Sequence, residues 1–408
     1  MPAHPMNIFI IPSWFPSDDH PVSGVMIKEQ TEAFCKYYPE VNIGISNWAQ
    51  QDERYLLWSK DHFKNLKKVI TSSTFSYAYQ LLPNLKVYCK PTFTWSKKIK
   101  AGNIKNVIKA NLNNLTAFEA EYGPVDVIHA HAAFPAGRIA MEISNKRDVP
   151  YCITEHMGPF PFPEILAKQG NLNKVYKQVY KYAAANIAVS PYQASLMKRV
   201  GINTRVIPNF INESVFKPSD YKVKPNRKFT FFSLSYIAPN KGTEILIQAA
   251  KAVIDDGYDI EFRIGGEGPF SAYCKDLTEQ LGIENNILWL GDINRDSVLS
   301  EFQNCDAFVL PSQYESMGIV YVEAIACGKP IISTKCGGPE TTVTKQNGLL
   351  SDKNDSRDLA RAIKHLVDRY GCYDSAEIRN DFLRRFSTQA VAPKLLSMYE
   401  ECMQPNSN

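Results

Sequence analysis

Short apolar runs alternate with amphipathic stretches along almost the whole sequence. The runs have the length of buried strands, and the stretches between them repeat apolar residues with the period of a helix. In the first half the pattern predicts strands over residues 8–12, 125–129, 151–154 and 186–189 and helices over 26–37 and 138–145. In the second half it predicts strands over 229–233, 261–264, 287–290, 307–310 and 331–333, separated by helices that begin near residues 243, 270, 297, 320 and 356. Such alternation is typical of α/β proteins with doubly wound parallel sheets.

The alternation is interrupted at IPNFINESVFKPSDYKVKPNRK, which is rich in Pro, Asn and Lys. Because the strand and helix pattern restarts after it, we place a domain boundary near residues 210–228. Ligands of doubly wound sheets bind outside the carboxyl ends of the strands. We therefore expect the functional residues of both domains to follow directly after strands.

Composition excludes several classes of protein. Of the 408 residues, 44% are hydrophobic and 22% charged, which are ordinary globular values and not those of a fibrous or disordered chain. No run approaches the roughly 20 apolar residues of a membrane helix, and the opening lacks the basic start and cleavage site of a secretion signal. The nine cysteines are scattered and never spaced as C-x-x-C, which argues against disulfides and zinc and suits a reducing cytoplasm.

The net charge of +4 is unevenly distributed, since residues 51–110 hold twelve Lys and Arg against three Asp and Glu. Aromatic residues are interleaved with these cations: Tyr55, Trp58, Phe63, Phe75, Tyr77, Tyr79, Phe93 and Trp95. Cations mixed with aromatic rings suit an anionic membrane surface, and a solvated face over core aromatics fits the pattern equally well. No nucleic-acid-binding motif accompanies the charge, so we expect no nucleic acid partner.

The strongest candidate site lies in DAFVLPSQYESMGIVYVEAIACGKPII, where a predicted strand ends and a polar loop leads into an apolar helix. If that helix starts near Gly318, the backbone N–H groups of its first turn are unpaired and can bind a phosphate or sugar hydroxyls. These groups belong to Met317, Gly318, Ile319 and Val320. Glu315 lies at the mouth of this site, and Glu323, one turn inside, can accept hydrogen bonds from a ribose diol. A solvated surface pair is the alternative, but Glu323 stands among apolar residues where an unpartnered charge is costly.

The same segment resembles the E-x7-E signature of the retaining glycosyltransferases of family 4. The resemblance extends to GIVYVEAIACGKPIISTKCGGPE, VIPNFINESVF, AVSPYQASLMKRVG and FLRRFSTQAVAPKLLSMYEE, and so covers nearly the whole chain. It implies the GT-B fold, two Rossmann-like doubly wound domains facing a central cleft, with an acceptor-side domain at 1–210 joined by a closing helix at 386–408 and a nucleotide-sugar-binding domain at 211–385. It also implies that Glu323 binds the ribose of a nucleoside diphosphate sugar. Glu315, Ser316 and the backbone that follows would hold the donor sugar and its phosphates.

A candidate cation lies in FFSLSYIAPNKGTEILIQAA, where Lys241 follows a predicted strand. A lysine at this place can stabilise the charge that builds on a diphosphate leaving group, although a solvated lysine at a helix start is the simpler interpretation of Lys241 alone. In the family an arginine five residues earlier commonly shares this role, and here that position is Tyr236. The departure leaves Lys241 as the main cationic clamp and makes a catalytically inactive sugar-nucleotide-binding module the alternative.

Three histidines follow strands of the first half. His129 and His131 form an H-x-H pair, but no third ligand cluster and no D-x-D accompanies them, so we predict no metal. The resemblance implies that His131 contacts the transferred sugar, and we expect His129 to be structural. His156 could meet the donor or the acceptor, or be merely exposed.

Glycines mark two further turns. Gly24 stands at a helix start after the first strand, where the backbone can approach a phosphate, and we assign it to the substrate site. Gly265, Gly266 and Gly268 do not complete a dinucleotide fingerprint, because Ser271 takes the place of the third glycine.

These residues and the resemblance together predict a retaining, metal-independent hexosyltransferase. It needs no cofactor, takes a nucleoside diphosphate sugar as donor and transfers the sugar to a saccharide or lipid-linked acceptor. The opening P-S-W-F-P resembles that of bacterial members that build surface polysaccharide, which implies a cytoplasmic enzyme, peripheral at the inner membrane surface. A hydrolase or phosphorylase on the same fold is a further alternative, but we find no sequence context for the cofactor lysine of a phosphorylase.

Overall fold

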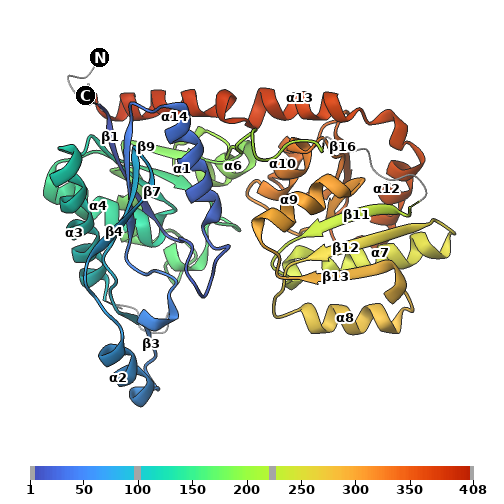
Figure 1. The fold of residues 1–408 in the computed structure, drawn as a ribbon, viewed down its shortest axis with the longest axis horizontal. Helices are drawn as coiled ribbons and strands as arrows, with labels where there is room; N and C mark the ends of the chain where they lie inside the picture. Colours follow the sequence, from blue (N-terminus) through green and yellow to red (C-terminus); the bar gives the residue numbers. More distant parts are fainter. Residues whose placement is uncertain (1–4, 96–102, 220–226, 405–408) are drawn as a thin grey trace. The chain divides into compact units, whose positions relative to one another are not determined.

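The computed structural model describes residues 5–95, 103–219 and 227–404. The chain divides into two compact units (Figure 1). The first comprises Met1–Val189, Ala194–Ile207 and Ala392–Asn408, and the second comprises Ser190–Gln193 and Pro208–Val391. The last helix, α14 (Thr388–Cys402), begins among residues of the second unit and continues into the first.

The first unit is built on an eight-stranded sheet of order β10-β9-β8-β7-β1-β2-β5-β4, parallel except for the antiparallel pair β4 and β5. Its strands are β1 (Asn7–Pro12), β2 (Asn42–Asn47), β4 (Tyr77–Leu82), β5 (Leu85–Cys89), β7 (Val127–His131), β8 (Tyr151–Glu155), β9 (Ala185–Ala188) and β10 (Arg205–Val206). The short strands β3 (Leu56–Leu57) and β6 (Thr94–Trp95) pair separately. Its helices are α1 (Val25–Tyr37), α2 (His62–Thr71), α3 (Ile104–Tyr122), α4 (Arg138–Arg147), α5 (Lys174–Lys181) and α6 (Pro191–Arg199), which starts in the second unit.

The second unit is built on a six-stranded parallel sheet of order β13-β12-β11-β14-β15-β16. Its strands are β11 (Phe229–Leu234), β12 (Ile260–Gly265), β13 (Ile287–Gly291), β14 (Ala307–Leu310), β15 (Ile331–Thr334) and β16 (Gly348–Ser351). Its helices are α7 (Thr243–Asp255), α8 (Ser271–Gln280), α9 (Arg295–Asn304), α10 (Ile319–Ala326), α11 (Pro339–Thr342), α12 (Ser356–Asp368) and α13 (Ser375–Phe386). Counted along the chain, this order is 3-2-1-4-5-6, so the strand order reverses between β11 and β14.

The central strands of both sheets are buried on their two faces, as continuous apolar strands require, whereas the edge strands β4 and β10 are largely exposed. All six residues of β1 are buried, and Phe9 on this strand packs against Phe118 of α3 with ring centroids 5.9 Å apart. In the second unit Phe231 stacks on Phe262 of the neighbouring strand at 5.2 Å. The cores therefore lie between each sheet and its helices, and polar residues at the strand ends are left to form sites.

The predicted fold class, two parallel doubly wound sheets, is confirmed. The strand predicted over residues 125–129 lies two residues later, so that β7 contains both His129 and His131. Their side chains share one face of the strand, with ring centroids 4.4 Å apart. The structure also adds elements for which we made no prediction, among them β2, β4, β5, α3 and α5.

None of the helices in the described ranges is long and apolar enough to cross a bilayer.

Candidate functional site

The reversal of strand order in the second unit places two predicted site residues beside each other. Lys241 lies in the loop after β11, and Glu315 lies in the loop after β14. Lys241 Nζ is 2.7 Å from Glu315 Oε1, and Ser312 Oγ donates a hydrogen bond to the same oxygen at 2.9 Å. The two loops touch at Gly242, which has φ of 73° and whose added Cβ would lie 2.0 Å from the carbonyl oxygen of Pro311. Only glycine fits this contact, which brings the cation to the carboxylate.

The backbone around Glu315 is fixed by the turn after β15. Gly338 N–H donates to the carbonyl oxygen of Glu315 at 2.9 Å. Helix α10 then begins at Ile319, with Gly318 before it, as the sequence predicted. Ser316 and Met317 are buried, and Ser316 Oγ has no hydrogen-bond partner among the described residues. A buried hydroxyl beside unpaired N–H groups of a helix start is a place where a polar ligand can bind.

Glu323 lies inside α10 with its side chain 3% exposed. Arg295, the first residue of α9, donates from Nη2 to Glu323 Oε1 at 2.8 Å. The Arg295 guanidinium also lies over the ring of Phe216, 4.8 Å from its centroid. Sequence reasoning did not find Arg295, because nothing local connects it to a carboxylate 28 residues away.

Tyr236, at the position where the resemblance implies an arginine, is 66% exposed. Tyr236 follows β11 in the sequence and precedes the loop that contains Lys241. The position therefore carries no positive charge, and Lys241 is the cation that the described residues bring to Glu315.

In the first unit, His129 is held by the protein on both sides of its ring. Its Nδ1 lies 2.7 Å from the hydroxyl of Tyr399 on α14, and its Nε2 lies 2.8 Å from Thr154 Oγ1 on β8. Burial, with His156 nearby, lowers the pKa of His129 to about 3. The ring is thus neutral at pH 7 and connects β7, β8 and α14.

His131 and His156 form a hydrogen-bonded, stacked pair. Their Nδ1 and Nε2 atoms are 2.9 Å apart and their ring centroids 5.1 Å apart. Burial lowers the pKa of His156 to about 4, and burial together with the other two histidines holds that of His131 well below its usual value. The Nδ1 atom of His156 is buried without a hydrogen-bond partner in the described part of the chain. Two neutral imidazoles can offer a substrate both a donor and an acceptor.

Glu155 is a residue that sequence reasoning missed. Its side chain is fully buried at the end of β8 and accepts hydrogen bonds from the N–H groups of Ala133, His156 and Met157 at 2.9–3.1 Å. The hydroxyl of Tyr180 donates to it at 2.8 Å. Burial raises the pKa of this carboxyl, and the four hydrogen bonds oppose the rise. Through these hydrogen bonds Glu155 holds together two loops, the one that follows His131 and the one that contains His156. A carboxylate at the end of an apolar strand was the signal that could have identified it.

Gly24 precedes α1 with φ of 70°, and an added Cβ would lie 2.3 Å from the carbonyl oxygen of Trp14. The loop after β1 thus folds closely onto the start of α1, which only glycine permits. Among the described residues, no three His, Cys, Asp or Glu side chains are grouped so that they could hold a metal ion.

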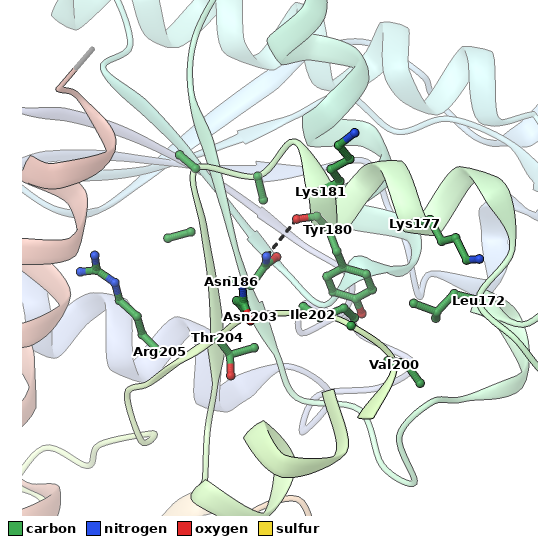
Figure 2. Close-up of a pocket in the computed structure, with 14 residues that line it drawn as sticks. Leu172, Lys177, Tyr180, Lys181, Asn186, Val200, Ile202, Asn203, Thr204 and Arg205 are labelled. Carbon is green, nitrogen blue, oxygen red and sulfur yellow. Dashed lines mark hydrogen bonds between the residues drawn. The ribbon is translucent and has the colours of Figure 1, made fainter. Parts of the chain in front are cut away.

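A separate pocket of about 630 Å³ lies in the first unit, beside the end of α5 and the amino-terminal ends of β9 and β10 (Figure 2). Its polar lining includes Lys177, Lys181, Asn186 and Arg205. None of the predicted site residues lines it. Those of the first unit follow the carboxyl ends of β1, β7 and β8, so the pocket is distinct from the candidate site.

Comparison with known proteins identifies the family of the chain. Residues 217–382 match the model of the glycosyl transferases group 1, and residues 101–215 match that of glycosyltransferase family 4. An uncharacterized glycosyltransferase of Methanocaldococcus jannaschii is 30% identical over 323 residues, which are 73% of this chain and 86% of that protein. The D-inositol 3-phosphate glycosyltransferase of Corynebacterium urealyticum is 31% identical over 168 residues, which are 39% of this chain and 40% of that protein.

Solved structures share the fold over nearly the whole chain. Sucrose-phosphate synthase of Thermosynechococcus elongatus superposes with a TM-score of 0.74 at 16% identity, covering 97% of this chain and 98% of that one. HepE of Anabaena, solved in complex with UDP-glucose, superposes with a TM-score of 0.68 at 19% identity, covering 97% and 99%. The fold is that of the GT-B enzymes. Within that class the chain belongs to glycosyltransferase family 4, whose members are retaining hexosyltransferases that use nucleotide sugars.

Proposed function

We propose that this enzyme transfers a hexose from a nucleoside diphosphate donor to a saccharide or lipid-linked acceptor in the building of cell-surface polysaccharide. The observation that carries the proposal is the ion pair of Lys241 and Glu315 beside the start of α10. It combines a cation for the leaving diphosphate, a carboxylate for the sugar and backbone donors for phosphate oxygens. The buried hydroxyl of Ser316 adds one more polar atom to the same loop.

In the proposed reaction, the bond from the anomeric carbon to the diphosphate oxygen breaks and a bond to the acceptor oxygen forms on the same face. The acceptor proton passes to the leaving phosphate oxygen, and the proposed reaction uses no metal or cofactor. Lys241 and the N–H groups of Met317, Gly318, Ile319 and Val320 stabilise the departing charge. Glu323 binds the ribose, and Glu315 and His131 orient the sugar.

We assign the acceptor to residues 1–210 with 386–408, and the donor to residues 211–385. In the acceptor part, Gly24 and His156 line the substrate site beside His131. Support comes from the neutral pair of His131 and His156, whose ring nitrogens suit sugar hydroxyls. In the donor part, we propose that Tyr236 contacts the donor; its exposure after β11 leaves it accessible to a ligand.

A lipid-linked acceptor is supported by exposed side chains on α2, the helix labelled in Figure 1. Phe63, Leu66 and Ile70 form one stripe along this helix and are 90%, 59% and 73% exposed. Lys64 and Lys67 lie on the same helix, in the basic segment 51–110. Exposed apolar side chains next to cations suit the interface of an anionic bilayer. We propose that α2 binds the cytoplasmic membrane surface, where the nine cysteines, all free thiols in the structure, stay reduced.

The proposed donor site can be tested by the shift in melting temperature with UDP, GDP and their sugars, with and without chelator. At a hundredfold excess over its dissociation constant, a ligand that binds only the folded state stabilises it by about 2.7 kcal/mol. We expect a chelator-insensitive shift with one nucleotide and its loss in Glu323→Ala. No shift with any nucleotide would contradict the proposal. Tight binding without turnover under any acceptor would favour the inactive binding module, whereas slow donor hydrolysis would favour an enzyme.

A further inference from the structure

The ion pair of Arg295 and Glu323 joins two helices of the second unit. Arg295 begins α9, after β13, and Glu323 lies within α10, after β14. The Arg295 side chain is 29% exposed, whereas that of Glu323 is 3% exposed. The guanidinium is held on one side by the carboxylate at 2.8 Å and on another by the ring of Phe216 at 4.8 Å. Phe216 is itself buried and packs edge-on against Phe302 of α9.

A carboxylate in this position depends on its cation. The residues that flank Glu323 along α10 are buried and apolar, so an isolated charge there would be strongly disfavoured and the group would take up a proton. The Cys327 thiol nearby is neutral, because burial raises its pKa. Arg379 of α13 lies close by but donates to the backbone carbonyls of Ala326, Phe216 and Glu213. Among the described residues, Arg295 pairs with Glu323 at 2.8 Å and so compensates its charge.

The protonation of Glu323 decides how it can bind a ribose. An ionised carboxylate only accepts hydrogen bonds and has about four acceptor positions, enough for Arg295 and two ribose hydroxyls together. A protonated carboxyl would lose the charge that strengthens such bonds. We propose that Arg295 is a positioning residue for the donor: it keeps Glu323 ionised and oriented, and so makes the site selective for a ribose over a deoxyribose. This inference rests on the proposed function of Glu323 as the ribose ligand.

The test is the ratio of dissociation constants for matched ribose and 2′-deoxyribose nucleotides, measured by titration calorimetry with UDP against dUDP and GDP against dGDP. We expect the wild-type protein to prefer the ribose form of its nucleotide by about tenfold or more, since a hydrogen bond to a charged group is lost with the hydroxyl. Arg295→Gln should lower this preference to near unity at pH 6. Phe216→Leu, which keeps the arginine but removes the ring beneath it, should lower it less.

The dependence of this ratio on pH separates positioning from a general loss of structure. In Arg295→Gln the ribose preference should return as the pH is raised from 5.5 to 8.5 and Glu323 ionises, whereas in the wild type it should stay constant. The control is Arg263→Gln, which removes a comparable ion pair to Glu301 on the same helix α9, with side chains 28% and 15% exposed. This control should lower stability but keep the wild-type ratio at every pH.

Each outcome distinguishes the inference from the function on which it rests. A wild-type ratio in Arg295→Gln at pH 6 would overturn the role of Arg295 and leave the donor site intact. If Arg295→Gln does not fold, the same measurement on Arg295→Met, which keeps an apolar stem over Phe216 but removes the charge, decides the matter: a wild-type ratio at pH 6 overturns the role. A wild-type protein that binds neither UDP nor GDP would overturn the proposed function, and with it this inference.

Discussion

The Lys241 ammonium lies 2.7 Å from the Glu315 carboxylate across 74 residues of sequence. The two side chains meet because their loops follow β11 and β14, the strands between which the order of the sheet reverses. Ser312 donates to the same carboxylate oxygen. The cation proposed for the diphosphate is thus already ordered before any ligand binds, which lowers the cost of arranging it during the reaction.

Replacing Lys241 by Met should therefore affect the reaction more than the fold. We expect kcat/KM for the sugar nucleotide to fall by about 10² to 10³, the effect of removing one preorganised electrostatic contact. The measurement is the rate of nucleoside diphosphate release. Lys251→Met is a matched control, because Lys251 pairs with Asp255 on the exposed side of α7 in the same unit. Equal rates in the two variants would contradict the role of Lys241.

The sequence was sufficient to locate this pair but not to describe it. Leu310 ends an apolar run and Gly318 precedes the next one, so the boundaries of β14 and α10 could be read from the local pattern. The ion pair itself, and that of Arg295 with Glu323, depend on which strands become neighbours. Local periodicity carries no information on such distant contacts.

The sequence pattern also failed to predict several features of the first unit. β2 and β5 escaped prediction because NIGISN is flanked by Asn and LKVYC lies in the basic segment, so neither gives a long apolar run. Glu155 was missed because its four donors come from three separate places in the chain, Ala133, the adjoining His156 and Met157, and Tyr180. The predicted strand that ended at His129 stopped two residues early, because the apolar run that marks it gives way there to HAH.

The buried histidines should make the protein sensitive to acid. A histidine whose pKa is lower in the folded than in the unfolded state contributes stability above its unfolded pKa of about 6.5, and this is lost as the pH falls toward the folded value. The folded pKa values are about 3 for His129 and about 4 for His156. For each of these two histidines, the unfolding free energy should therefore fall by roughly 2 kcal/mol as the pH is lowered from 7 to 5. Urea unfolding from pH 7.5 to 5 measures this slope.

The contribution of one ring can be isolated with His129→Gln. This variant should be less stable at pH 7, because the contacts to Tyr399 and Thr154 are weakened, but its stability should fall less steeply below pH 6.5. His20→Gln, at an exposed position, should keep the wild-type slope. An identical slope in all three proteins would show that His129 does not stay neutral when folded.

Glu155→Gln should destabilise the first unit and disturb the histidine pair. An amide offers one acceptor oxygen and turns an NH₂ group toward donors, so about two of the four hydrogen bonds are lost, at about 1–3 kcal/mol for each buried donor left unpaired. We expect a matching drop in unfolding free energy and a lower kcat, since the loops beside His131 and His156 are released.

A double-mutant cycle with Tyr180→Phe checks that assignment. Tyr180→Phe alone removes one donor to the carboxylate and should cost about 1 kcal/mol. In the double variant the amide of residue 155 no longer faces a phenol hydroxyl. The loss of unfolding free energy should therefore be smaller than the sum of the losses in the two single variants. Strict additivity would mean that Glu155 and Tyr180 act independently, against the 2.8 Å contact.

Membrane binding through α2 should depend on both its apolar stripe and its lysines. Phe63→Ser with Ile70→Ser should abolish most binding to vesicles that contain phosphatidylglycerol, because 90% and 73% exposed side chains lose their apolar surface. Lys64→Gln and Lys67→Gln should each weaken binding by about 1 kcal/mol, roughly fivefold, and reduce its dependence on salt. Co-sedimentation with anionic and with neutral vesicles measures both effects.

Tyr182→Ser, at an exposed apolar position outside α2, serves as the control and should bind the vesicles as the wild type does. Binding that ignores lipid charge and salt would refute an electrostatic contribution from these lysines.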